Sequence, residues 1–458
     1  MRISDTLTGN KREFTPISGN QVRMYVCGVT PYAPVHVGHA MSYIVFDVVR
    51  RYLTYLGYDV RHVQNFTDVD DKLIDRANQG NTTVEALAQQ FIDDYFQSMD
   101  SLNILRAHEY PKASQEVPGM LEMISGLIEK GYAYESSGDV YFRVTKNADY
   151  GKLSHRSLDT MRAGARLEVS ELKEHPMDFA LWKAAKPGEP TWDSPWGPGR
   201  PGWHIECSVM SRHYLGPTID IHGGGQDLIF PHHENEIAQS EAFEGGDAPF
   251  SQFWLHNGLL QLDKEKMSKS LGNLVTVKET LERFEPDAIR LFVLQSHYRS
   301  PLSYSEESLQ GAERAALRLR QAVNLKGPEN TGDALDASAY RERFKTAMDD
   351  DFNTPQAVAA LFDLAHEINR AVEQGRGVND AQETMRELGG QVLGFTYTEP
   401  DVAVSDEMSV RIQALVDKRQ ALRTERNFAD ADAARDELTA LGVTLTDTPT
   451  GTEWHLQG

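Results

Sequence analysis

The sequence predicts an α/β protein in which a parallel-sheet region with an insertion precedes a helical region and a small C-terminal α/β tail. Three observations support this prediction. Near the N-terminus a strand, a turn, an amphipathic helix and a second strand follow one another, as in a parallel α/β sheet. The middle of the chain becomes rich in Pro, Gly and Trp around residues 186–201. After Ser305 the alternation of strands and helices gives way to helices.

The first elements follow from apolar patterning and turn residues. We expect, in order, a strand at 22–29, a helix at 40–56, a strand at 58–66 and a helix at 67–77. Thr30-Pro31 ends the first strand, and Gly57 ends the first helix. Ligands of parallel sheets bind beyond the carboxyl ends of the strands. Cys27 and the segment 36–39 fall at that edge, so we expect a functional site there.

The remaining chain divides where the pattern of predicted secondary structure changes and at polar linkers. After the insertion, the α/β pattern resumes at 218–221. A linker at 398–406 precedes a helix pair and a hairpin expected at 444–456. The predicted parts are a parallel-sheet domain at 1–305 with an insertion at about 110–200, a helical domain at 306–397 and the tail at 407–458.

Composition sets outer limits on function. At 458 residues the chain is long enough for two or three domains. No apolar stretch approaches the roughly 20 residues of a membrane span, and the N-terminus lacks a signal-peptide core, so we expect a cytoplasmic protein with no membrane partner. The net charge of −22 argues against salt-driven nucleic-acid binding over the whole surface. This charge does not exclude a local basic cluster, and one is formed by Lys418, Arg419, Arg423 and Arg426. The cluster is either a nucleic-acid contact or a solvated helix face.

Two short segments predict nucleotide chemistry. His36-Val37-Gly38-His39 precedes the first predicted helix, and a Lys-Met-Ser-Lys-Ser loop occupies 266–270. Histidines at a helix start can bond phosphate oxygens, helped by the positive end of the helix dipole. Lys266 and Lys269 can neutralise charge that gathers on a leaving diphosphate. Together the segments predict a site where the α-phosphate of ATP is attacked and pyrophosphate is expelled.

Four residues form a candidate metal set. The chain has two cysteines, Cys27 and Cys207, and a structural disulfide is not expected in the cytosol. His232 and Glu236 are four residues apart at a predicted helix start, so they share one face about 6 Å apart along the axis. A Cys2HisGlu set suits zinc. A solvent-facing helix start for His232 and a small core residue for Cys27 are the alternatives.

Several motifs carry a resemblance to a known family. Residues 25–32 (YVCGVTPY), 202–208 (GWHIECS), 222–225 (HGGG) and 231–236 (PHHENE) resemble the cysteinyl-tRNA synthetases, which are class I aminoacyl-tRNA synthetases. The similarity runs from about residue 20 to the Thr-Glu-Trp ending at 454, in the family's order and spacing. The one visible departure is Val37, where the class motif has Ile, and this apolar exchange puts nothing in doubt.

The resemblance implies a Rossmann-like catalytic domain with an insertion, a helical-bundle domain on the anticodon side and a small C-terminal tRNA-binding domain. It implies one Zn²⁺ per chain, bound by Cys27, Cys207, His232 and Glu236. It also implies catalytic and ATP-binding roles for His36, His39, Lys266 and Lys269.

Further expectations concern the substrates. Gly223, Gly224 and Gly225 are consecutive, and glycines leave room for the backbone to approach the adenosine of ATP. The alternative is an ordinary tight turn. Trp203 is expected to pack over the substrate side chain or to be a buried core residue, and Asp227 to hold its ammonium group. Mg²⁺ is expected to accompany ATP. The expected partners are ATP, L-cysteine and the tRNA for cysteine, and the chain is expected to be a monomer.

The implied reaction is activation of cysteine to cysteinyl-adenylate and transfer of cysteine to tRNA. The enzyme must separate cysteine from serine, and a difference in size alone discriminates about 10–200-fold. A zinc ion that takes the substrate sulfur as a thiolate, at about 2.3 Å, leaves a serine hydroxyl a poor ligand. A 10⁴-fold preference for cysteine over serine needs a free-energy difference of about 5.5 kcal/mol. No editing domain is therefore expected.

Three alternative functions share parts of this pattern. A ligase that joins cysteine to an amino sugar in mycothiol biosynthesis shares the catalytic core, but it would not need the chain after Ser305. A non-catalytic zinc- and tRNA-binding regulator would not need both His36 and His39 with Lys266 and Lys269. A nucleotidyltransferase for a small cofactor does not explain the insertion and the helical end.

Overall fold

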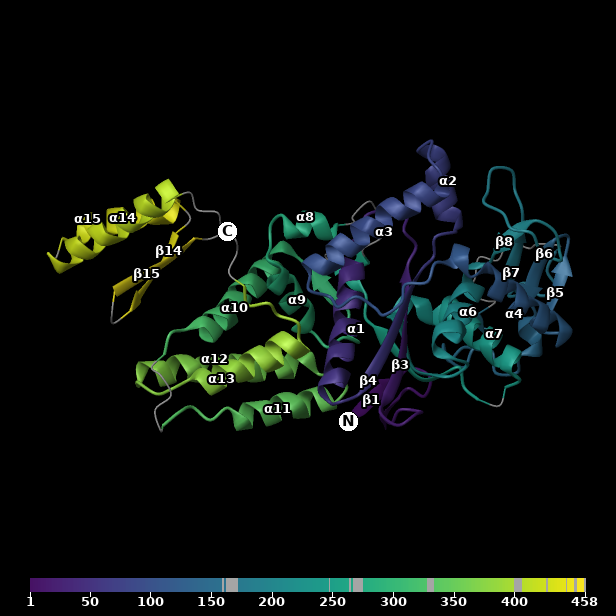
Figure 1. The fold of residues 1–458 in the computed structure, drawn as a ribbon, viewed down its shortest axis with the longest axis horizontal. Coiled ribbons are helices and arrows are strands. Elements are labelled where there is room, and N and C mark those ends of the chain that lie inside the picture. The colour runs from purple at the N-terminus through teal and green to yellow at the C-terminus, as the bar shows by residue number, and fades with distance from the viewer. Residues whose placement is uncertain are drawn as a thin grey trace. The chain divides into compact units, whose positions relative to one another are not determined.

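The computed structural model describes residues 1–158, 160–161, 172–246, 248–262, 265–266, 275–327, 333–398, 406–425, 427–441, 443–448 and 451–456. The chain forms two compact units, Met1–Tyr397 and Thr398–Gly458 (Figure 1). Among the described residues, no helix combines the length and the apolar composition that crossing a bilayer requires.

A four-stranded parallel sheet organises the first unit. Its strands are β3 (Gln21–Val29), β4 (Asp59–Phe66), β9 (Ile219–Gly225) and β10 (Ser251–Asn257), in the order β10-β9-β3-β4. The chain moves outward from β3 to β4 on one side and from β9 to β10 on the other. The topological switch point therefore lies between β3 and β9, where parallel α/β sheets bind their ligands. The predicted parallel sheet is confirmed, with strand starts within one residue of those expected.

Capping side chains set the first helix boundaries. α1 (Val37–Tyr55) begins three residues earlier than predicted, because His36 is its N-cap and its Nδ1 accepts from the His39 amide at 3.3 Å. The helix predicted to open at 67 was wrong at its start: α2 (Asp71–Gln79) begins after Asp70, whose carboxylate accepts from the Lys72 amide at 2.9 Å. Among the described residues up to 294, the other α-helices are α3 (Val84–Ser101), α4 (Val117–Glu129), α6 (Trp203–Leu215), α7 (Glu234–Glu244), α8 (Val277–Leu281) and α9 (Pro286–Leu294).

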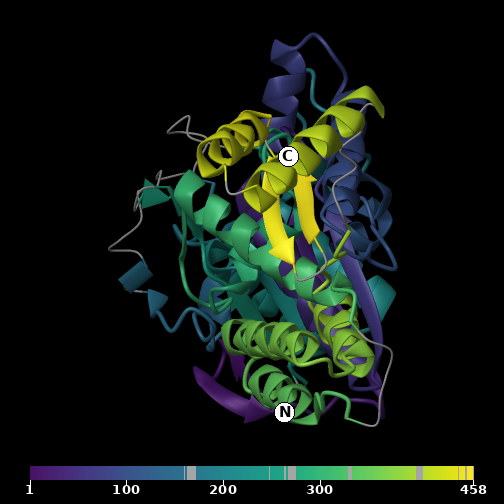
Figure 2. The ribbon, with the colours of Figure 1, turned by 90° about the vertical axis from the view of Figure 1, so that its left-hand side faces the viewer.

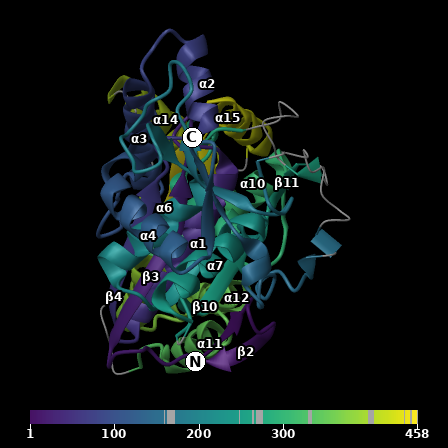
Figure 3. The ribbon, with the colours of Figure 1, turned by 90° about the vertical axis from the view of Figure 1, so that its right-hand side faces the viewer.

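The insertion contains a second, antiparallel sheet. Its strands, in spatial order, are β5 (Ala133–Ser136), β6 (Asp139–Phe142), β7 (Phe179–Ala184) and β8 (Gly199–Pro201). Its apolar core includes residues of α4, α6 and α7, so the inserted sheet packs on the helices that flank β9 (Figure 3). Shorter strands complete the unit: β1 (Arg2–Asp5), β2 (Asn10–Glu13), β11 (Leu260–Leu262), β12 (Glu265–Lys266) and β13 (Leu302–Tyr304).

The helical region packs directly on the sheet region. It consists of α10 (Glu306–Asn324), α11 (Ser338–Asp349), α12 (Thr354–Glu373), α13 (Asn379–Met385) and a π-helical segment, Arg386–Val392 (Figure 2). Its apolar residues share one core with α1 and α9. The compact unit consequently extends to Tyr397, and the division near residue 305 stays a prediction.

The second unit is a helix pair followed by a hairpin, as predicted. It contains α14 (Asp406–Thr424), α15 (Phe428–Ala440), β14 (Val443–Thr448) and β15 (Gly451–Leu456), and the two strands are antiparallel. Arg419, expected on a basic face, is instead 9% exposed and donates to Thr452 Oγ1 at 3.4 Å. Arg426 lies outside the described residues.

Candidate active site and metal centre

The four predicted metal ligands come together at the switch point. Cys27 lies near the carboxyl end of β3, Cys207 in the second turn of α6, and Glu236 in the first turn of α7. His232 belongs to the π-helical segment Ile229–His233 that leads into α7. All four side chains are buried, and their donor atoms lie within 4.8 Å of one another.

The distances among these donors fit one tetrahedral ion. Two sulfur ligands at about 2.3 Å from zinc lie about 3.8 Å apart in a tetrahedron, and Cys27 Sγ and Cys207 Sγ are 3.7 Å apart. A sulfur and a carboxylate oxygen would be about 3.6 Å apart, and Cys27 Sγ lies 3.5 Å from Glu236 Oε1. His232 Nε2 is 3.0 Å from the same oxygen. The donor set thus has the chemistry and spacing of a zinc site.

Burial controls the protonation of these ligands. Burial, reinforced by the neighbouring Cys207, raises the pKa of the Cys27 thiol well above its usual value. Burial also lowers the pKa of His232 well below its usual value, so this imidazole keeps the lone pair that a metal requires. A divalent cation would stabilise the thiolates and so would lower the pKa of the Cys27 thiol again.

A second donor arrangement replaces Cys207 and His232 by His222 and His233, while it keeps Cys27 and Glu236. His222 Nε2 lies 2.7 Å from Glu236 Oε2, a hydrogen-bond distance, and thereby leaves Oε1 directed toward Cys27 and His232. His233 Nε2 lies 3.2 Å from Cys27 Sγ. This geometry favours positioning roles for His222 and His233 behind the Cys2HisGlu set.

The sequence assigned no role to four histidines that surround the Cys2HisGlu set: His204, His222, His233 and His256. Two of them, His204 and His256, contact the rings of His232 and His233. His204 Nδ1 lies 3.0 Å from His232 Nδ1, and His233 Nδ1 lies 2.8 Å from His256 Nε2. Such contacts select the ring nitrogen that faces a ligand site. A usable signal existed for His204 and His233, because they stand in the same short motifs as the predicted ligands, and for His222, which opens the glycine motif at 222–225.

Trp203 contacts the candidate ligand set directly. Its indole stacks on His232 with centroids 4.1 Å apart and planes 15° apart, while 38% of the residue remains exposed. The alternative of a fully buried core tryptophan is therefore excluded by this exposure. Contact with the substrate side chain stays a prediction.

His36 and His39 lie together at the start of α1. Their rings stack with centroids 3.6 Å apart. Burial lowers the pKa of His36 to about 4, with Asp227 opposing the shift, and burial lowers the pKa of His39 well below its usual value. Both imidazoles are therefore neutral at neutral pH. Because His36 Nδ1 accepts from the His39 amide, the His36 proton resides on Nε2, as a donor.

The glycine run has a packing role that the sequence did not predict. The three glycines continue β9 rather than forming a turn. A Cβ on Gly223 would lie 2.3 Å from the Phe46 ring, and one on Gly224 would lie 2.9 Å from the His233 ring. Their missing side chains let α1 and His233 approach β9. Contact of Gly223, Gly224 and Gly225 with ATP stays a prediction.

The lysine loop lies mostly outside the described residues, including Lys269. Lys266 has its backbone in β12, paired with β11. The chain that leaves the loop returns to the start of α1, where the Val37 amide donates to Val275 O at 3.0 Å and the Val277 amide donates to Val35 O at 2.9 Å. The chain from residue 275 onward therefore begins beside α1, at whose start His36 and His39 lie.

Comparison with sequence models of known families divides the chain into three matched segments. Residues 13–314 match the tRNA synthetases class I (C) catalytic domain, residues 343–398 the DALR domain, and residues 405–454 the cysteinyl-tRNA ligase anticodon binding domain. The parallel sheet, its insertion and the site at its switch point accordingly define a class I aminoacyl-tRNA synthetase.

Curated relatives specify the family within that class. The chain is 55% identical over 458 residues, all of both chains, to the cysteine–tRNA ligase of Dehalococcoides mccartyi strain 195. It is 48% identical, again over all of both chains, to that of Geobacter metallireducens. It is 50% identical to that of Geobacillus thermodenitrificans over 99% of this chain and 98% of the relative. The chain belongs to the cysteine–tRNA ligase family, enzymes that charge tRNA with cysteine.

Solved structures support the fold independently. A methionyl-tRNA synthetase of Mycobacterium tuberculosis, solved with methionyl-adenylate, aligns with a TM-score of 0.62 at 18% identity and covers 83% of this chain and 92% of its own. A leucyl-tRNA synthetase of Agrobacterium radiobacter in a ternary complex aligns with a TM-score of 0.61 at 12% identity, covering 86% and 88%. At these identities the likeness concerns the fold alone.

Proposed function

We propose that this chain selects cysteine through one zinc ion held by Cys27, Cys207, His232 and Glu236, and that it activates cysteine at the adjoining nucleotide site. The observation that carries the proposal is the tetrahedral spacing of two thiols, an imidazole and a carboxylate at the switch point. When bound, zinc would supply a Lewis acid that favours the thiolate of cysteine over the hydroxyl of serine. His222 keeps Glu236 oriented by its 2.7 Å contact.

For the activation step, the carboxylate of cysteine attacks the α-phosphate of ATP, and pyrophosphate leaves. His36 and His39, neutral because they are buried, would donate N–H groups to phosphate oxygens at the positive end of α1. Lys266 and Lys269 would neutralise charge on the departing pyrophosphate, together with Mg²⁺. The protein's contribution is positioning and charge stabilisation, without a covalent intermediate on the chain.

The amino acid itself would be held by groups between the two sites. Asp227 follows β9, close to His36, and is placed to bind the ammonium group of cysteine. Trp203 would pack beside the substrate next to His232. A Cβ on Gly225 would lie 2.6 Å from Asp227 Oδ1, so the two residues are close. The backbone of Gly223, Gly224 and Gly225 would face ATP. The regions 306–397 and 407–458 would bind tRNA on its anticodon side.

Metal analysis with matched variants tests this proposal. The wild-type chain should hold about one zinc per chain, and Cys207→Ser should lose zinc and cysteine-dependent ATP–pyrophosphate exchange together, because an alcohol is a far weaker ligand. Ser211→Ala, a buried change one turn along α6, should keep both. Full zinc in the double variant Cys27→Ser, Cys207→Ser would falsify the assignment.

The amino-sugar ligase remains the nearest alternative activity. The match of residues 405–454 to an anticodon binding domain favours tRNA as the acceptor. Cysteine-dependent exchange followed by aminoacylation of tRNA, measured on one sample, separates the two. Exchange without any charging of tRNA would favour the amino-sugar reaction.

A further inference from the structure

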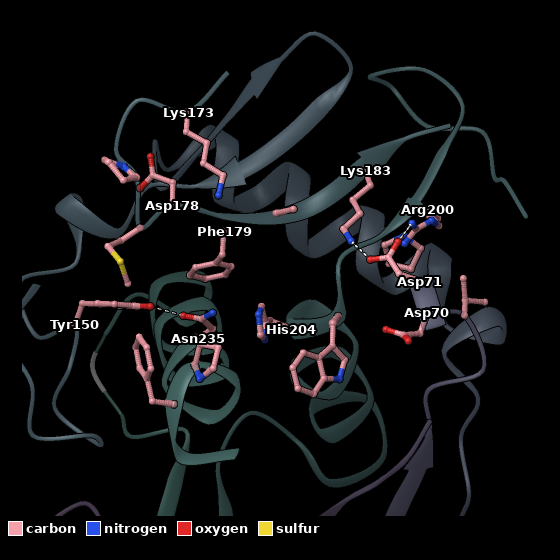
Figure 4. A pocket seen from close by; sticks show the side chains of 18 residues that line it. Asp70, Asp71, Tyr150, Lys173, Asp178, Phe179, Lys183, Arg200, His204 and Asn235 are labelled. Atoms are coloured by element: carbon pink, nitrogen blue, oxygen red, sulfur yellow. Dashed lines mark hydrogen bonds and ion pairs between the residues drawn. The ribbon is translucent and has the colours of Figure 1, made fainter. Parts of the chain in front are cut away.

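The carboxyl end of β4 lies beside the candidate metal centre. Trp203, which stacks on His232, also lines a pocket of about 420 Å³. Asp70 and Asp71, which follow β4, line the same pocket (Figure 4). The residues that end β4 are therefore at the same edge of the sheet as the metal ligands.

Strand β3 carries a bulge immediately after Val26. Its pairing with β9 ends at Val26, and along β4 its register shifts between Val26 and Val29. Two residues of β3, Cys27 and Gly28, stand there opposite one residue of β4, Asn65. Two residues against one define a β-bulge, and bulges beside active sites re-aim side chains.

The bulge changes the side of the sheet toward which β3 points. Cys27 shares a core with Cys207 of α6. Residues two apart in a regular strand share a face, so a regular β3 would direct Val29 toward α6 as well. Val29 instead packs in the core that contains α1. Cys27 is therefore the last residue of β3 that points to the metal centre, and the Val29 side chain stays on the α1 side.

One side chain of β4 holds the bulge. The Gly28 amide donates to Asn65 Oδ1 at 2.8 Å, and Asn65 Nδ2 donates to Thr67 Oγ1 at 3.3 Å. The second bond fixes which end of the amide group faces Gly28. Asn65 is only 1% exposed, so water cannot readily replace it as the acceptor for Gly28.

The peptide between Cys27 and Gly28 is held closely. A Cβ at position 28 would lie 1.6 Å from Asn65 O, so only glycine allows this approach of β3 to β4. On the other side, the Tyr43 hydroxyl of α1 lies 3.5 Å from Cys27 O. The backbone that carries the first metal ligand is thus fixed by groups from β4 and α1.

We propose that Asn65 is a positioning residue for the metal centre, because it holds the bulge that directs Cys27 toward Cys207 and Glu236. The inference rests on the proposed function, in which Cys27 is a zinc ligand. Loss of the Asn65 acceptor would leave the Gly28 amide unpaired. Strand β3 could then return to a regular register, which would turn Val29 toward α6.

The zinc affinity of the full chain, measured by competition with a chelator, tests this proposal. Asn65→Ala should weaken the affinity by about 10–100-fold, the usual effect of losing a group that orients a metal ligand. Asn65→Asp keeps an acceptor of the same shape, so its affinity should lie closer to that of the wild type. The matched control Asn103→Ala loses a comparable hydrogen bond, from Nδ2 to Gly394 O at 2.8 Å, and should bind zinc as the wild type does. Equal affinities in Asn65→Ala and Asn103→Ala would overturn the proposal.

Cobalt(II) in place of zinc separates positioning from stability. Thiolate ligands give bound cobalt a strong charge-transfer absorption, whose intensity reports how many thiolates bind the ion. At saturating cobalt, this absorption in Asn65→Ala should fall toward that of Cys27→Ser. Absorption equal to that of the wild type would mean that Cys27 is positioned without Asn65.

Hydrogen exchange in the wild type gives a reading that needs no variant. Gly28 is half-buried, so its amide should exchange slowly only if a hydrogen bond protects it. Rapid exchange would overturn the proposal, even if Asn65→Ala failed to fold. Absence of zinc from the wild type would instead refute the proposed function.

Discussion

Replacing Arg290 by Met tests how the helical region is joined to the catalytic sheet. Arg290 lies on α9 and is 0% exposed. Its Nη2 donates to Asp47 Oδ2 at 2.7 Å, its Nε to Leu393 O at 3.0 Å, and its Nη1 to Leu102 O at 3.0 Å. Asp47 belongs to α1, the helix that His36 caps. One guanidinium thus joins the active-site helix to the end of the helical region.

The expected loss can be estimated from these contacts. Removing one partner of a buried ion pair costs about 3–5 kcal/mol, because it leaves an uncompensated charge and unpaired carbonyls. Arg51 Nε, 2.8 Å from Asp47 Oδ2, moderates the loss without replacing the carbonyl contacts. For the unit Met1–Tyr397, an unfolding entropy of about 0.8 kcal/mol per kelvin converts this cost to a decrease in Tm of about 4–6 °C.

Thermal unfolding of the full chain, followed by circular dichroism, measures the effect. The matched control is Arg343→Met, which removes an arginine from an exposed pair with Asp363 in which the side chains are 54% and 57% exposed. An exposed pair contributes at most about 1 kcal/mol, so the control should shift Tm by about 1 °C or less. If Arg290→Met lowered Tm no more than this control, the guanidinium would not be the junction inferred here.

Three other outcomes are expected. Burial lowers the pKa of His62 to about 3, and neither ring nitrogen has a partner among the described residues. In the unfolded chain the pKa of this histidine is about 6.5, so below that pH the unfolded state binds more protons than the folded state. Between about pH 7.5 and pH 5, urea unfolding should therefore show the wild type losing about 2 kcal/mol more than His62→Leu, and an equal loss in both would contradict the burial argument. Lys269→Ala should lower kcat for ATP–pyrophosphate exchange by orders of magnitude with a smaller change in KM for cysteine, because charge gathers on pyrophosphate only as its bond breaks; an unchanged kcat would remove the loop from the mechanism. A chain ending at Tyr397, the end of the compact unit, should retain exchange and lose most aminoacylation, whereas equal charging by the shortened chain would require another role for the C-terminal unit.

Features encoded over a few residues could be predicted from the sequence. The strand at β3 and the helix after it follow from an apolar run and from the turn residues that bound them. The spacing of His232 and Glu236 placed them on one face, and their donors lie 3.0 Å apart. The C-terminal hairpin was predicted because its strand and turn residues alternate locally. The resemblance, carried by short motifs, led to the family.

Only tertiary packing decided the remainder. Cys27 and Cys207, 180 positions apart, meet at 3.7 Å because β3 and α6 pack together at the switch point. The contact of His222 with Glu236, the buried position of Arg419 and the pocket beside Trp203 likewise depend on elements that are distant in sequence. Periodicity and capping report interactions within about one or two turns of a helix. Distances between elements are set by how their side chains fill shared space, and a local sequence pattern does not encode them.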